Sequence, residues 1–113
     1  MGLSVPMDEY CVAMTTCASD EDAQRLCTVL LEEQLAACVQ VVEIHSHFVW
    51  KGGQQSKPEK LLLIKSRRAL YSKIEAALQS AHPYETPEII CLPVIQGAAP
   101  YLSWINDVTM PNS

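Results

Sequence analysis

Two histidines two residues apart are the first candidates for chemistry in this sequence. His45 and His47 lie in the run from Cys38 to Trp50, where polar and apolar residues alternate as in a β-strand. Residues two apart on a strand face the same side, so the two imidazoles can chelate one cation, with Glu43 beside them. The alternative is a solvated strand face that binds Cu(II) or Ni(II) only adventitiously. The sequence leaves both interpretations open.

The segment QSAHPYETPEIICLPV, residues 79–94, is the second candidate, because it carries three prolines just before and within an expected strand. Proline restrains the preceding residue toward an extended backbone, so His82 and Thr86 are both held in place. Imidazole is a common ligand of Cu(II) and Zn(II), although one histidine rarely holds a metal tightly. In the structural alternative, His82 ends a helix, where a cationic side chain suits the helix dipole.

The sequence shows neither a motif for nucleophilic catalysis nor a phosphate-binding loop. Nucleophilic catalysis needs a cysteine or serine with a base and an orienting group, and no motif proposes such a trio. Gly52 and Gly53 lack the Gly-Lys-Ser continuation of a phosphate-binding loop. We therefore do not expect an enzyme.

Charge and cysteine usage restrict the class of protein further. The formal net charge of -5 argues against nonspecific nucleic-acid binding. No apolar run approaches the ~20 residues that span a bilayer, and the first ten residues lack a secretory signal pattern. The five cysteines form no C-x-x-C pair, so neither a disulfide framework nor a zinc knuckle is indicated. We expect a soluble, cytoplasmic protein without a membrane or nucleic-acid partner.

The order of hydrophobic patterns predicts the fold. Strands are expected over 9–16, 38–50, 59–66 and 88–96, and helices over 19–35, 67–82 and 98–108, with a turn or mobile loop over 51–58. This order predicts an α+β, ferredoxin-like βαββαβ domain with an antiparallel sheet and a short C-terminal helix. The length indicates a single domain over residues 1–113, with flexible ends at 1–8 and 109–113.

The second strand is the unusual element. At about 13 residues it exceeds the typical 5–6, so its hairpin with the third strand must extend past the sheet. Phe48 and Trp50 would be exposed there in a monomer, and long uncovered edges are a liability. We therefore expect a partner subunit to cover this hairpin and the open face of the sheet.

Four motifs in order resemble the CutA divalent-cation-tolerance proteins. They are LAACVQV at 35–41, Trp50-x-Gly52, HPYETPEI at 82–89, and P-x-x-x-G-x-x-x-YLSWI at 93–105. The resemblance runs from about Val12 to Asp107. It implies a PII-like fold, a cytoplasmic homotrimer, and a role in tolerance of divalent metals, particularly copper.

The resemblance also implies a metal site. The family's ligands are a cysteine near the end of the first strand and two adjacent histidines at the HPY motif. His82 matches the second histidine, whereas Ala81 stands at the first. The cysteine position falls at Thr15, and Cys17, on the same strand face, is the substitute candidate. The implied ligand is Cu(II) or another divalent metal, without an obligatory cofactor.

A cleft between subunits is the last feature that the resemblance implies. Its residues would form an interfacial polar network or line a small-ligand cleft like that of PII proteins. The candidates are Trp50, Glu59, Lys65, Tyr84, Glu85 and Trp104. Two functions follow: a trimeric metal-binding protein, or a PII-like signalling or scaffold trimer that binds a small molecule or a partner protein.

Overall fold

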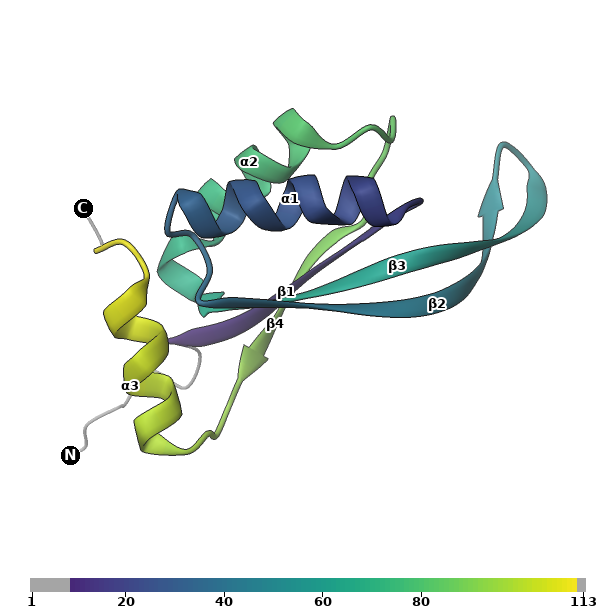
Figure 1. Cartoon of the computed structure of the whole chain (residues 1–113). Coiled ribbons are helices and arrows are strands. Elements are labelled where there is room, and N and C mark those ends of the chain that lie inside the picture. Colours follow the sequence, from purple (N-terminus) through teal and green to yellow (C-terminus); the bar gives the residue numbers. More distant parts are fainter. Residues whose placement is uncertain (1–8, 112–113) are drawn as a thin grey trace.

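The computed structural model describes residues 9–111 and contains one four-stranded antiparallel sheet with two helices on one face and the C-terminal helix at the end of the sheet (Figure 1). The sheet order is β2-β3-β1-β4, and the predicted ferredoxin-like α+β fold is confirmed. In chain order the elements are β1 (Tyr10–Cys17), α1 (Asp20–Glu32), β2 (Cys38–Trp50), β3 (Gly53–Arg67), the 3₁₀ turn η1 (Arg68–Leu70), α2 (Tyr71–Ala81), β4 (Ile89–Val94) and α3 (Ala99–Val108).

Helix α1 begins where the sequence predicts and ends earlier. The Ser19 hydroxyl accepts a hydrogen bond of 3.1 Å from the Asp22 backbone N–H, and acidic residues fill the first turn. The helix ends at Glu32, three residues before the expected end at Leu35. The reason is Gln34, which adopts a left-handed backbone with φ 58°. This turn places Leu35 in the core.

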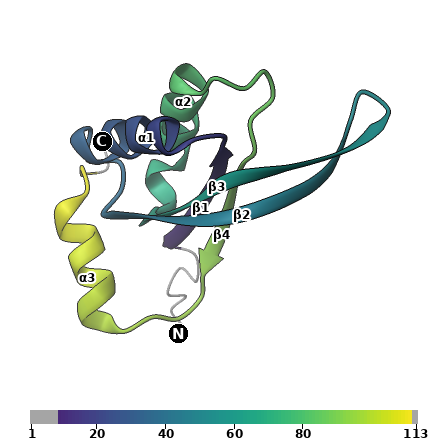
Figure 2. The same ribbon diagram turned by 45° about the vertical axis from the view of Figure 1, so that its right-hand side comes forward.

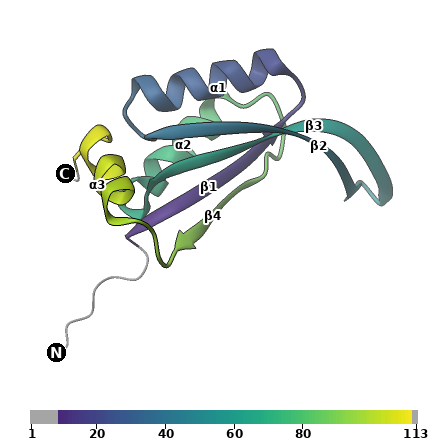
Figure 3. The same cartoon turned by 60° about the horizontal axis from the view of Figure 1, so that its bottom comes forward.

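The core lies between the sheet and the helices α1 and α2 (Figures 1 and 3). Its largest fully buried apolar side chains come from α1, β3, η1 and α2. They are Leu26, Leu30, Leu62, Ile64, Leu70, Ile74 and Leu78. Burial of each such side chain stabilises the fold by about 1.5–3 kcal/mol, so the position of α1 and α2 on this face is firmly set.

The hairpin of β2 and β3 is longer than predicted. Only Lys51 and Gly52 form its turn, with φ angles of 50° and 81°, the positive values that a two-residue hairpin turn requires. The expectation of a loop over 51–58 is therefore wrong, because β3 already begins at Gly53. Strand β1 pairs with β3 only as far as Lys60. Residues 44–59, called the arm below, extend from the sheet as two strands alone (Figure 2).

The C-terminal end is held more tightly than expected. Thr109 was expected in a flexible end, yet it is buried. Its hydroxyl accepts a hydrogen bond of 3.0 Å from Arg67 Nε and donates one of 2.9 Å to the Ile105 carbonyl. A guanidinium N–H of Arg67 also reaches the Met110 carbonyl. The remaining predicted ends, 1–8 and 112–113, lie outside the described residues.

The sheet face opposite α1 and α2 exposes apolar side chains. Met14, Leu63 and Ile90 form one row across three strands, and Leu92 lies in the next row. Ile90 and Leu92 are about half exposed. None of the helices within residues 9–111 is long and apolar enough to cross a membrane.

Candidate functional site

A cleft lies between the arm and the segment Pro83–Glu88, called the corner below, which leads from α2 to β4. The cleft has a volume of about 820 Å³. Half of the residues that line it are aromatic or acidic. The arm contributes His47, Phe48, Trp50, Glu59 and the basic Lys57, and the corner contributes Tyr84, Glu85 and Glu88.

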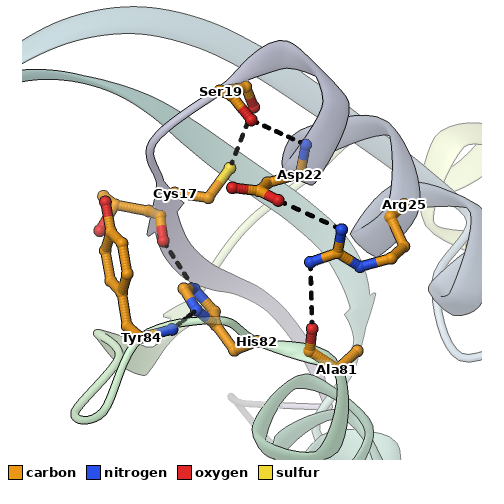
Figure 4. A network of polar contacts seen from close by, with 8 residues as sticks. Cys17, Ser19, Asp22, Arg25, Ala81, His82 and Tyr84 are labelled. Carbon is orange, nitrogen blue, oxygen red and sulfur yellow. Dashed lines mark hydrogen bonds and ion pairs between the residues drawn. The ribbon is translucent and has the colours of Figure 1, made fainter.

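His82 caps the C-terminus of α2, and the structure gives both of its ring nitrogens a partner (Figure 4). Nε2 lies 2.7 Å from the Thr16 carbonyl oxygen, and Nδ1 lies 3.2 Å from the Tyr84 backbone nitrogen. A carbonyl only accepts and a backbone N–H only donates, so Nε2 carries the proton and Nδ1 accepts. His82 thus ties the corner to the end of β1, and neither nitrogen offers a free lone pair to a metal.

Cys17 is buried in the core at the end of β1. Its thiol donates to the Ser19 carbonyl at 3.7 Å, and Figure 4 shows the sulfur directed toward Ser19 rather than toward the His82 ring. Burial, followed by the charge of Asp22, raises the pKa of the Cys17 thiol. Since metals bind the thiolate, Cys17 is poorly prepared to act as a ligand here. Thr15 is also buried, and its hydroxyl oxygen has no hydrogen-bond partner within the described part of the chain.

The centre of the cleft is a polar cluster of three residues. The Tyr84 hydroxyl donates to Glu59 Oε2 at 2.6 Å, and the Lys57 ammonium lies 3.9 Å from the same oxygen. Lys57 Nζ also lies 4.3 Å from the centroid of the Tyr84 ring. Burial first, then the hydrogen bond to Glu59 and its charge, raises the pKa of Tyr84. Glu59 is only 6% exposed, so its carboxylate is held in a fixed position.

The histidine pair lies on the arm. The ring centroids of His45 and His47 are 5.2 Å apart, and His45 Nε2 shares a hydrogen bond of 2.7 Å with the Ser56 hydroxyl. The Glu43 carboxylate, the suggested third ligand, instead binds Lys60 at 3.2 Å. Across residues 9–111, no three histidine, cysteine or acidic side chains are grouped closely enough to hold a metal.

The structure brings only part of the predicted cleft network together. Glu59, Tyr84, Glu85 and Trp50 all line the cleft. Lys65 does not, because it pairs with Val12 and Cys38 in the body of the sheet. Trp104 also lies elsewhere, on α3, where its ring contacts Tyr101 at 5.6 Å between centroids.

Sequence reasoning missed Lys57 as a cleft residue. The glycine, glutamine and proline residues around Lys57 predict a loop rather than a strand. A signal was present, since Gln55, Lys57 and Glu59 share one parity, as cleft-facing residues of a continued strand would.

The comparisons with known proteins agree on one family. The family model described as "CutA1 divalent ion tolerance protein" matches residues 11–108. A CutA homolog from Xenopus laevis is 42% identical over 85% of this chain, and a divalent-cation tolerance protein CutA from Thermus thermophilus is 36% identical over 87% of it. The chain spans 64% of the length of the Xenopus relative and 96% of that of the Thermus relative. The mouse protein CutA is 39% identical, with 55% of its length covered.

The solved structures that resemble this chain are also CutA1 proteins. CutA1 from the psychrotrophic bacterium Shewanella sp. SIB1 superposes with a TM-score of 0.86 at 38% identity, covering 90% of this chain and 96% of that one. The Thermus thermophilus structure superposes with a TM-score of 0.86 at 35% identity, covering 89% and 99%. With a family model that matches nearly all of the described residues and relatives that share both sequence and fold, this chain belongs to the CutA1 divalent ion tolerance protein family.

Proposed function

We propose that the chain acts in divalent-cation tolerance as a cytoplasmic homotrimer that binds a divalent transition metal weakly, Cu(II) foremost, through His45 and His47. This is a binding function rather than a catalytic one. The observation that carries it is the 5.2 Å separation of two imidazole rings on one side of the arm. Imidazole suits Cu(II) and Zn(II), and two ligands without a third account for weak binding.

The hydrogen bonds of His82 favour the arm over the HPY motif as the metal site. A metal at His82 would have to displace either the Thr16 carbonyl from Nε2 or the Tyr84 N–H from Nδ1. Either change leaves a backbone group, at the end of β1 or at the corner, without its His82 partner, which costs about 1–3 kcal/mol when that group is buried. At the arm, only the hydrogen bond between His45 and Ser56, on an exposed surface, has to rearrange.

The uncovered apolar surface supports a homotrimer. Among residues 9–111, strand β2 pairs with β3 alone, so no described strand covers its outer edge. Val49 is 72% exposed at the arm tip, and the open sheet face exposes Ile90 and Leu92. Exposed apolar surface of this extent marks an interaction site, and a second copy of the chain is the expected partner. The five free cysteines support a reducing compartment such as the cytoplasm.

Sizing with light scattering tests the assembly. Trp50→Asp places a charge on the arm and should give monomers where the wild type gives trimers. Lys51→Asp, at the neighbouring turn position, is the matched control and should remain trimeric. A Trp50→Asp protein that stays trimeric would remove the arm from the assembly.

Calorimetric titration of the metal-free protein with Cu(II) and Zn(II) tests the metal site. We expect weak Cu(II) binding by the wild type, loss of binding in the His45→Ala/His47→Ala double variant, and retention in His82→Ala. Thermal unfolding of each variant, recorded first, ensures that folded proteins are compared. Loss of binding in His82→Ala alone would assign the metal to the HPY motif instead.

A second function is favoured by the cleft itself. We propose as the alternative a PII-like signalling or scaffold trimer whose clefts take a small molecule or a segment of a partner protein. A volume of about 820 Å³ lies within the usual range of small-ligand sites, roughly 300–1,000 Å³. This function predicts a saturable ligand-induced change at the cleft residues that is independent of metal.

A further inference from the structure

The charge of the cleft lining is strongly one-sided. Glu59, Glu85 and Glu88 contribute three carboxylates, whereas Lys57 contributes the single ammonium. The lining therefore carries a formal excess of two negative charges. A cleft with this balance attracts cations and repels anions.

The walls of the cleft add a second preference for cations. Phe48, Trp50 and Tyr84 all line it, and aromatic faces attract ammonium groups through their quadrupoles. The combination of several aromatic rings with carboxylates is the arrangement by which proteins recognise amines.

Lys57 shows where a cation sits in this cleft. Its ammonium lies 4.3 Å from the Tyr84 ring centroid, 5.7 Å from the Phe48 centroid and 3.9 Å from Glu59 Oε2. It thus occupies a position bounded by two rings and a carboxylate. The Lys57 side chain is 40% exposed and has a flexible stem, so it is able to leave this position.

The acceptor at this position is fixed before any ligand arrives. Glu59 is 6% exposed, and the 2.6 Å bond from the Tyr84 hydroxyl orients its carboxylate. A preorganised acceptor binds a cation without the entropy cost of first being ordered.

We infer that the cleft binds a small organic cation of the alkyl-amine class, whose ammonium group displaces that of Lys57 from the position between Tyr84, Phe48 and Glu59. This inference rests on the second proposed function, in which the cleft takes a small ligand. A diamine carries a second ammonium for Glu85 or Glu88, which also line the cleft.

Three probes of similar length and different charge test the inference: 1,6-diaminohexane, 1,6-hexanediol and adipate. Each is titrated into the ¹⁵N-labelled protein, and the indole N–H signal of Trp50 in the cleft is followed. The indole of Trp104 on α3 is the internal reference. We expect saturable shifts of the Trp50 signal with the diamine only, and no shift of the Trp104 signal with any probe.

Variants that change the charge of the cleft lining test the inference further. Lys57→Met removes the competing internal cation and should tighten diamine binding by up to about fivefold, as expected for a partly exposed like-charge pair. Glu85→Gln/Glu88→Gln should weaken it. The control Glu32→Gln/Glu33→Gln, which removes the same charge at the C-terminal end of α1, should leave it unchanged.

The outcomes distinguish failure of the cation inference from failure of the proposed small-ligand function. Binding of adipate or hexanediol in place of the diamine, or weaker diamine binding by Lys57→Met, would overturn the cation inference alone. No saturable shift with any of the three probes would overturn both the inference and the proposed small-ligand cleft.

Discussion

Replacing Tyr84 with phenylalanine removes one oxygen atom and tests how the corner is fastened to the arm. In the wild type the Tyr84 hydroxyl donates to Glu59 at 2.6 Å, and the Lys57 ammonium lies 3.9 Å from the same carboxylate. A hydrogen bond to a charged group contributes about 1.5–3 kcal/mol, and Glu59 is too deeply buried to recover the loss from water. We expect Tyr84→Phe to lower the free energy of unfolding at pH 7 by about this amount.

The same substitution has a defined pH dependence. The folded protein raises the pKa of Tyr84 through burial and the bond to Glu59, whereas the unfolded chain releases the proton near the ordinary value of about 10. Above that pH the unfolded state binds fewer protons than the folded state, so the stability of the wild type falls as pH rises. Phenylalanine has no proton to release. The difference between the two proteins should therefore shrink above pH ~10, by at most about 1.4 kcal/mol per pH unit.

Urea unfolding at one fixed protein concentration measures both effects, since the stability of an oligomer depends on concentration. The control is Tyr101→Phe, a substitution of an exposed tyrosine on α3, which should change the free energy of unfolding by less than about 0.5 kcal/mol. A Tyr84→Phe protein as stable as this control at pH 7 would refute the reasoning. So would a stability difference that stays constant from pH 9 to pH 11.

Two further predictions concern buried polar contacts. Long-range ¹H–¹⁵N correlation spectra at pH 8 should show neutral His82 protonated at Nε2, because Nδ1 accepts from Tyr84; protonation at Nδ1 would contradict the contacts of the corner. Thr109→Val should lower the free energy of unfolding by about 1.5–3 kcal/mol, since it removes the bonds to Arg67 and to the Ile105 carbonyl. Chemical denaturation measures this loss, and wild-type stability would show that the end of the chain contributes little.

The fold was predictable because its signals are local. The serine cap and the acidic first turn set the beginning of α1, and hydrophobic periodicity set its buried face. The end of α1 was not predictable, because Gln34 adopts a left-handed backbone conformation that its residue type does not predict. The start of β3 was missed for a related reason, since pairing with β2 outweighs the poor strand propensity of residues 53–58.

The site was harder to predict because its contacts join distant parts of the chain. Sequence reasoning placed His82 at a helix end correctly, yet its carbonyl partner Thr16 lies 66 residues earlier. Lys65 and Glu59 share a strand face, but six residues of strand separate them by about 20 Å. A shared parity therefore predicts the face on which two residues lie, and only the tertiary structure brings them into one cleft.

Strand β3 has one part that packs on the core and one part on the arm, and both proposed binding sites use residues of the arm. Residues 60–67 pair with β1, and within this part Leu62 and Ile64 are fully buried, so that truncating either costs about 2–5 kcal/mol. Residues 53–59 pair with β2 alone, and most of them are free of core packing. His45 and His47 alternate with Phe48 and Trp50 along β2, so the proposed metal pair and the aromatic wall of the cleft lie on opposite faces of the arm. Any coupling between a metal on one face and an organic cation on the other is reciprocal, so each would change the binding of the other by the same factor.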